Sequence, residues 1–176
     1  MQDLSQEFVS WQPLFITQAG ICATLAGLLF VALSLHAATM RLPQNVNLKR
    51  LAENTFSDFI LVLFVGLFTL IPGETATVLG VSLLMTVVVV SRPFLGLFVK
   101  TLRDREARLH RQHLFWRLGL ALLARIFLII GAYGLLTWHA DRYDIWRDLL
   151  FVFSGATALM ISATRNAWFL LMHELT

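Results

Sequence analysis

Residues 55–99 have the sequence TFSDFILVLFVGLFTLIPGETATVLGVSLLMTVVVVSRPFLGLFV, an apolar run broken near its centre by a proline, a glycine and a glutamate. A bilayer core about 30 Å thick is crossed by roughly 20 apolar helical residues, so this run is long enough for two crossings. Proline and glycine end a helix, and the carboxylate of Glu74 requires water. We therefore expect a helical hairpin, with one helix over 55–71 and a second over 75–95.

Three further apolar segments reach the length of a membrane span, over residues 13–38, 117–138 and 148–172. The whole chain is 57% hydrophobic and 14% charged, with a mean hydropathy of +0.71. Because a soluble domain is about 25% charged, so few polar side chains cannot cover a water-facing surface, which excludes a soluble enzyme or a disordered protein. The sequence predicts an all-α fold, a polytopic transmembrane helical bundle of five spans that forms a single domain over residues 1–176.

The distribution of basic residues predicts the orientation of the chain, because short cytoplasmic loops collect lysine and arginine. With five spans, a loop over 39–54 and a basic connector over 96–116 fall on the same side, which is then the cytoplasm. Residues 1–12 contain no basic residue, and we expect them to form an amphipathic segment on the outer surface. The amino end is therefore expected outside and the carboxyl end in the cytoplasm, in a cell inner (plasma) membrane.

Several charged and polar residues lie in the inner half of the predicted spans, where a basic side chain costs about 2.5 to 3.5 kcal/mol on insertion scales. The candidates for an intramembrane charge, anion or lipid site are Arg125, Arg165, Asp58, Arg92, Asn166 and His36. In a structural interpretation, Asp58 pairs with Arg125 or Arg165, and the remaining arginines extend to inner phosphates. In a functional interpretation, these residues form an anion or lipid-headgroup site, or a gate, in the inner leaflet. Helical spacing places Arg165 on the small-residue side of the last span, so we expect it to face other helices.

Small residues at four-residue spacing mark faces through which membrane helices approach closely. The first span has Ala19, Ala23 and Gly27, with Gly20, Thr24 and Ser34 on nearly the same side, and the last span has Ser154, Ala158 and Ser162. These residues are candidates for helix packing, inside the bundle or between protomers, and the polar ones of the first span are candidates for lining a pore. Because so small a bundle has little interior of its own, we expect a homo-oligomer with the first span at its centre.

The sequence contains none of the HExxH, GxSxG, Walker or GxGxxG motifs, so no enzyme activity and no cofactor is expected. His110 and His113 are three residues apart, but no cysteine or convergent acid completes a metal-ligand set, and no metal is expected. The positive-inside rule accounts for the charges of the connector, which argues against nucleic acid as a partner. Contact with the bilayer and with anionic lipid headgroups at the cytoplasmic face is expected instead.

Two segments, GICATLAGLLFVALSLH at 20–36 and ATRNAWFLL at 163–171, resemble a group of uncharacterised small bacterial multi-pass inner-membrane proteins. Proteins of that group have a GLLFVALSL-like first helix and an RNAW-like last helix. The resemblance implies a bacterial origin and directs attention to Arg165, Asn166 and Trp168 as a unit. It implies no activity.

Two classes of function fit these observations. The leading hypothesis is a channel-like or small-solute permeation protein, formed as a homo-oligomer, in which an arginine-rich inner layer favours anions or controls opening. It is supported by the charges at depth and by the polar small residues of the first span, although no selectivity-filter signature is present. The alternative is a membrane module that transports nothing, such as a regulator, an assembly factor or a membrane-perturbing effector that acts through helix-helix contacts.

Overall fold

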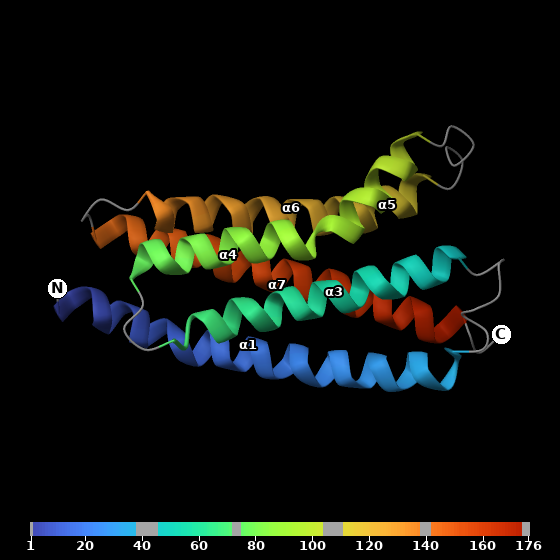
Figure 1. The fold of residues 1–176 in the computed structure, drawn as a ribbon, viewed down its shortest axis with the longest axis horizontal. Helices are drawn as coiled ribbons and strands as arrows, with labels where there is room; N and C mark the ends of the chain where they lie inside the picture. Colours follow the sequence, from blue (N-terminus) through green and yellow to red (C-terminus); the bar gives the residue numbers. More distant parts are fainter. Residues whose placement is uncertain (1, 38–45, 72–74, 104–110, 138–141, 174–176) are drawn as a thin grey trace.

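The computed structural model describes residues 2–37, 46–71, 75–103, 111–137 and 142–173, and this part of the chain is helical apart from short turns, with no strand (Figure 1). The helices are α1 (Gln2–Leu35), α3 (Val46–Phe68), α4 (Ala76–Val90), α5 (Arg92–Arg103), α6 (Arg111–Leu136) and α7 (Arg142–His173). The all-α fold expected from the sequence is confirmed.

Five of these helices lie lengthwise beside one another, and α5 turns away from them at one end (Figure 1). The chain alternates in direction through α1, α3, α4, α6 and α7, so that the end of α1, the beginning of α3, the beginning of α6 and the end of α7 lie together. The helix α6 packs along α7 and α4, and α3 packs along α1 and α7. The interior of the bundle therefore lies mainly between α3, α4, α6 and α7.

Four of the described helices contain segments that are long and apolar enough to cross a membrane. These segments are Val9–Leu35, Leu48–Phe68, Gly119–Leu136 and Ile145–Met172. The helix α4 is also apolar but has only 15 residues. The chain thus has the helices of an integral membrane protein.

The predicted hairpin corresponds to α3 and α4, but both helices differ from the expected ranges. The residues assigned to the loop over 39–54 are partly helical, because α3 begins at Val46. The span expected over 75–95 is divided at Ser91, whose backbone N–H closes the last turn of α4 on the Val87 carbonyl. Pro93 has no N–H to continue that ladder, yet it is tolerated in the first turn of the next helix. The chain therefore restarts as α5.

The helix α1 is continuous from Gln2 to Leu35, so residues 2–12 are part of this helix and no boundary separates them from the predicted span 13–38. Pro13 lies inside α1 and cannot donate to the carbonyl one turn earlier. The Thr17 hydroxyl donates to the Pro13 carbonyl at 2.7 Å, which adds a bond within the same turn. The sequence predicted a separate segment over 1–12 and a span from residue 13, whereas one helix covers both.

Glycine allows two pairs of helices to approach closely. A Cβ atom added at Gly66 of α3 would lie 2.6 Å from the Cβ of Ala19 in α1, and one at Gly80 of α4 would lie 2.7 Å from the Ala132 carbonyl oxygen in α6. Neither position has room for a side chain unless a helix moves. The sequence analysis did not single out Gly66 and Gly80, which make these close contacts.

Candidate functional site

The charged centre of the bundle is an ion pair between Arg125 of α6 and Asp58 of α3. Both side chains are buried, with exposed fractions of 4% and 0%. Arg125 Nη2 donates to Asp58 Oδ1, so of the two arginines proposed as partners of this carboxylate it is Arg125 that pairs with it. The helix spacing brings Asp58 inward together with Phe59 and Val62, which are also buried.

The other nitrogens of the Arg125 guanidinium are bound as well. Nε donates to the hydroxyl of Ser91 at 3.1 Å, and Nη1 donates to the Ala121 carbonyl oxygen at 3.1 Å. The ring of Phe94 covers one face of the group, with the Arg125 Cζ atom 3.9 Å from the ring centroid. A cation over an aromatic face is attracted by the ring quadrupole, and the attraction is stronger away from water. Arg125 thus joins α6, α3, the α4–α5 junction and α5.

This arrangement has a structural role, because it fixes the positions of the helices that it joins. Two opposite charges that are buried together neutralise one another, and removal of one partner leaves an uncompensated charge at a cost of about 3–5 kcal/mol. Because the guanidinium is buried, paired with Asp58, bound to Ser91 and Ala121 and covered by Phe94, its charge is not presented to a passing solute. Arg125 therefore positions helices and does not by itself form an anion site.

A polar stripe on α3 continues from this centre toward the beginning of the helix. Asn54 lies one turn before Asp58 and is 2% exposed, and Thr55 is fully buried and donates to the Leu51 carbonyl oxygen at 2.7 Å. Sequence reasoning missed Asn54 and Thr55. Their spacing of three and four residues from Asp58 was the signal, because residues at that spacing share a helix face.

The remaining charged candidates do not join this centre. Arg92, the first residue of α5, and Arg165 of α7 are exposed. Asn166 is 4% exposed and therefore buried, and His36 is half-buried with Nδ1 2.9 Å from the Ala32 carbonyl oxygen. Of these three described arginines, Arg125 is neutralised, and Arg92 and Arg165 are exposed, so they do not share one environment.

The expectation that Arg165 faces other helices fails within a single chain. The buried face of α7 is centred on Val152, Ala156, Leu159 and Ala163. Arg165 lies about 150° from the middle of this face at 3.6 residues per turn, and its side chain is exposed. The small residues of α7 lie on the same side of the helix as Arg165: Ser162 is buried, and Ser154 and Ala158 are half-buried.

The small residues of α1 point in two directions. Ala19 is 6% exposed and packs against Gly66. The others are exposed farther round the helix, and we call this set the outer face of α1: Gly20, Ala23, Thr24, Gly27 and Ser34. A Cβ atom added at Gly20 or Gly27 would meet nothing within 4 Å in the described part of the chain. These two glycines therefore do not pack the single chain, whereas Ser34 lines a groove between α1 and α3.

The hydroxyls of the outer face are bound within their own helix. Thr24 Oγ1 donates to the Gly20 carbonyl oxygen at 2.9 Å, and Ser34 Oγ donates to the Phe30 carbonyl oxygen at 2.8 Å. A hydroxyl bound in this way donates its only proton within the helix, but its oxygen keeps lone pairs that can accept a further hydrogen bond. The hydroxyls of the outer face can therefore lie in lipid, because their protons are already hydrogen-bonded. They can also accept hydrogen bonds from a solute.

The opposite face of α1 attaches it to the bundle through polar and aromatic contacts that sequence reasoning missed. Gln18 is 5% exposed, and its Nε2 atom donates to the Thr157 hydroxyl of α7 at 2.6 Å. Trp11 is 8% exposed, and its ring centroid lies 5.9 Å from that of Trp146 and 6.0 Å from that of Phe153. These contacts settle which side of α1 faces α7.

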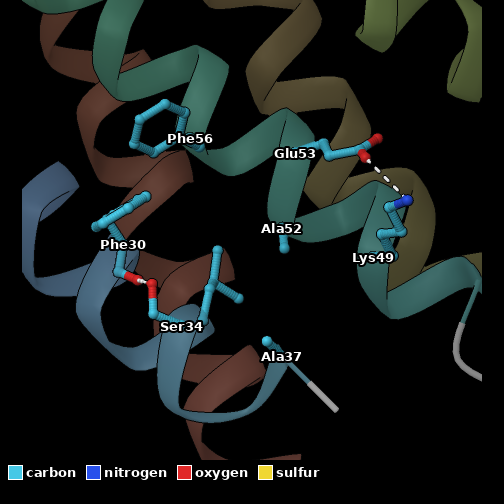
Figure 2. A pocket seen from close by; sticks show the side chains of 8 residues that line it. Phe30, Ser34, Ala37, Lys49, Ala52, Glu53 and Phe56 are labelled. Atoms are coloured by element: carbon cyan, nitrogen blue, oxygen red, sulfur yellow. Dashed lines mark hydrogen bonds and ion pairs between the residues drawn. The ribbon is translucent and has the colours of Figure 1, made fainter. Parts of the chain in front are cut away.

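A groove of about 410 Å³ lies between the end of α1 and the beginning of α3. Its apolar walls come from Phe30 and Leu33 of α1 and Phe56 of α3 (Figure 2). Lys49 and Glu53 of α3 also line it, with Lys49 Nζ 3.9 Å from Glu53 Oε1. The sequence did not single out this groove, because its two walls come from different helices.

Within the described residues, no three histidine, cysteine, aspartate or glutamate side chains gather to hold a metal ion. His110 lies outside the described residues, as does the side chain of His113. Comparisons of the chain with protein-family models, with curated proteins and with solved structures found no match.

Proposed function

We infer that the protein crosses the membrane five times, through α1, α3, α4, α6 and α7, with the amino end outside and the carboxyl end in the cytoplasm. The alternating direction of these helices supports this topology (Figure 1). Lys49 and Arg50 near the beginning of α3 and Arg111 at the beginning of α6 lie toward the same end of the bundle, as the positive-inside rule requires. The helix α4 spans by continuing with the first apolar residues of α5.

The protein acts, in this proposal, as a homo-oligomeric channel-like or small-solute permeation protein, with the path between protomers along α1. The observation that carries this proposal is the outer face of α1, which holds small and hydroxyl residues and which, at Gly20 and Gly27, meets nothing in the described part of its own chain. Membrane helices associate through such faces, because small residues let backbones approach. The accepting lone pairs of Thr24 would then face the path.

The charge of the path would come from Arg165 and Arg92, which are exposed, and not from Arg125, which is neutralised by Asp58. Exposed arginines near the cytoplasmic end would favour anions in the path. The buried centre would instead keep α3, α5 and α6 in register. The arginine-rich inner layer is thus divided between a structural residue and two candidates for selectivity.

The second candidate is a membrane module that transports nothing and acts as a regulator, an assembly factor or a membrane-perturbing effector. One observation favours it: the hydroxyls of Thr17, Thr24 and Ser34 all donate to carbonyls of their own helix, so the outer face of α1 needs no water. In this case the same face would contact another membrane protein.

We place the protein in the inner membrane of a bacterium, without enzyme activity and in contact with anionic headgroups at the cytoplasmic face. The support is the resemblance of residues 20–36 and 163–171 and the basic residues at one end of the bundle. Nucleic acid is not needed to explain those charges.

The two candidates are separated by chloride efflux from liposomes that contain the purified chain. The permeation proposal expects efflux from wild-type liposomes that falls in Thr24→Leu and Gly27→Leu. Leu28→Ala is the matched control, because Leu28 is 63% exposed on the same helix and is not part of the outer face as defined. Silent wild-type liposomes, with another membrane protein that co-purifies unless Gly27 is replaced, would overturn permeation in favour of the second candidate.

A further inference from the structure

The groove between α1 and α3 has the dimensions and lining of a ligand site. Its volume of about 410 Å³ lies within the range of pockets that bury small molecules, about 300–1,000 Å³. Phe30 and Phe56 come from different helices and bound the same space, and Leu33 completes the apolar lining (Figure 2). Such an apolar lining suits a hydrocarbon chain, and the Ser34 hydroxyl is the polar group beside it on α1.

Two opposite charges lie beside this apolar lining. Lys49 and Glu53 are one turn apart on α3, and their side chains are 61% and 56% exposed (Figure 2). The single contact of 3.9 Å between Nζ and Oε1 leaves most of the hydrogen-bonding capacity of these two groups unused. An ammonium has three donors, and a carboxylate has four lone-pair sites. Both ions can therefore bind a further group without leaving their positions.

The charges and the apolar lining meet where the apolar part of two helices ends. The apolar segment of α1 is Val9–Leu35, and that of α3 is Leu48–Phe68, so the groove lies at one end of both. If these helices cross the membrane as proposed above, the groove opens at the boundary between lipid tails and headgroups of the inner leaflet. The argument rests on that placement, but it does not depend on permeation.

We propose that this groove binds one phospholipid whose headgroup combines a phosphate with a primary ammonium, as in phosphatidylethanolamine. One acyl chain lies against Phe30, Leu33 and Phe56. The Lys49 ammonium donates to the phosphate, and the lipid ammonium donates to the Glu53 carboxylate. Because Lys49 Nζ and Glu53 Oε1 are 3.9 Å apart, they present both charges to a headgroup that lies along the membrane surface.

Charge complementarity selects this lipid over the two obvious competitors. A phosphatidylglycerol headgroup carries a net negative charge and no cation, so it meets Lys49 favourably but is repelled by Glu53. A phosphatidylcholine headgroup is zwitterionic, but its quaternary ammonium has no N–H to donate to a carboxylate. Only the primary ammonium supplies both the charge and the hydrogen bonds that Glu53 accepts.

The experiment is native mass spectrometry of the full chain in detergent, titrated with phosphatidylethanolamine, phosphatidylglycerol and phosphatidylcholine that have identical acyl chains. We expect phosphatidylethanolamine to bind about tenfold more tightly than either competitor, as for one charge-assisted hydrogen bond. Glu53→Gln should abolish this preference, and Lys49→Gln should weaken all three lipids. Equal binding of the three lipids by the wild type, or a preference that survives Glu53→Gln, would overturn the proposal.

A second pair of variants tests the apolar lining. Phe30→Ala should weaken all three lipids, whereas Leu28→Ala, at a residue of nearly equal exposure on the same helix, should weaken none. Equal losses in both variants would indicate lipid that coats the helix, and would contradict a groove site. Lipid binding and chloride efflux are separate readouts, so a chain that binds phosphatidylethanolamine but conducts nothing would refute permeation and leave the lipid site standing.

Discussion

The interior of the bundle and the outer face of α1 contain the same kinds of residue in opposite surroundings. Between α6 and α7, a Cβ atom added at Gly155 would lie 2.8 Å from the Ala124 carbonyl oxygen. At Gly27 of α1 the same atom would meet nothing within 4 Å in the described part of the chain. Gly155 therefore marks a close contact between two helices of the chain, whereas Gly27 marks no contact within the described part of it.

Polar groups show the same contrast. Arg125 donates to Asp58 of α3 and to Ser91 at the α4–α5 junction, whereas Thr24 on the outer face of α1 donates to the carbonyl of Gly20 in its own helix. A substitution inside the bundle should therefore reduce the stability of the single chain. A substitution on the outer face should leave that stability unchanged and alter association.

The largest effect is expected at the buried ion pair. Arg125→Met should lower the free energy of unfolding by about 3–5 kcal/mol, because Asp58 is then a buried charge without a partner. The double variant Asp58→Leu with Arg125→Met removes both charges and should recover much of this loss. Unfolding in mixed detergent and SDS measures all three chains. A double variant that is less stable than Arg125→Met alone would contradict this structural role of the ion pair.

A smaller effect is expected from a matched pair of glycine substitutions. Gly155→Leu should destabilise the chain by about 1–3 kcal/mol, because α6 and α7 must separate to admit the side chain. Gly27→Leu should leave thermal stability of the monomer unchanged and reduce the oligomer seen by light scattering in detergent. Similar melting temperatures for the two variants would contradict the claim that the interior, and not the outer face, packs the single chain.

The polar contact between α1 and α7 should matter less. Gln18→Leu removes the bond to Thr157, and interhelical hydrogen bonds in membrane proteins average about 0.6 kcal/mol. We expect a loss below about 1 kcal/mol in the same SDS titration. Thr17→Val is the control on the exposed side. A loss of several kcal/mol for Gln18→Leu alone would show that α1 depends on this one contact.

The smallest effect on stability is expected at Arg165. This side chain is exposed, so Arg165→Gln should change the free energy of unfolding by less than about 0.5 kcal/mol. Under the permeation proposal it should lower the preference for chloride over potassium, which a reversal potential in planar bilayers measures. A strongly destabilised Arg165→Gln would show that this arginine is part of the packing after all.

The sequence predicts the all-α fold and the long apolar helices, four of which in the described part of the chain can cross a membrane, because apolar length is a local property. It also limits the partner of Asp58 to two arginines, since a buried carboxylate requires a cation. It cannot choose Arg125 over Arg165, because the choice depends on how α6 and α7 are rotated toward α3. Rotation is set by contacts such as Gly155 against Ala124, which involve two helices at once.

The same limit explains the small residues of α1. Spacing places Ala19, Ala23 and Gly27 near one side of the helix, but Ala19 is buried and Gly27 is exposed, because the contact with α3 covers only the edge of that side. The groove at Lys49 and Glu53 could not be predicted from the sequence for a similar reason, because it forms only where α1 and α3 lie together.

The central claim is that the outer face of α1 meets a second copy of the chain. Disulfide cross-linking in native membranes tests it most directly, with Thr24→Cys in a Cys22→Ala background and with Val88→Cys, exposed on α4, as the control. The account predicts a rapid dimer for Thr24→Cys and none for Val88→Cys. A Thr24→Cys chain that stays monomeric, or one that cross-links no faster than Val88→Cys, would contradict it.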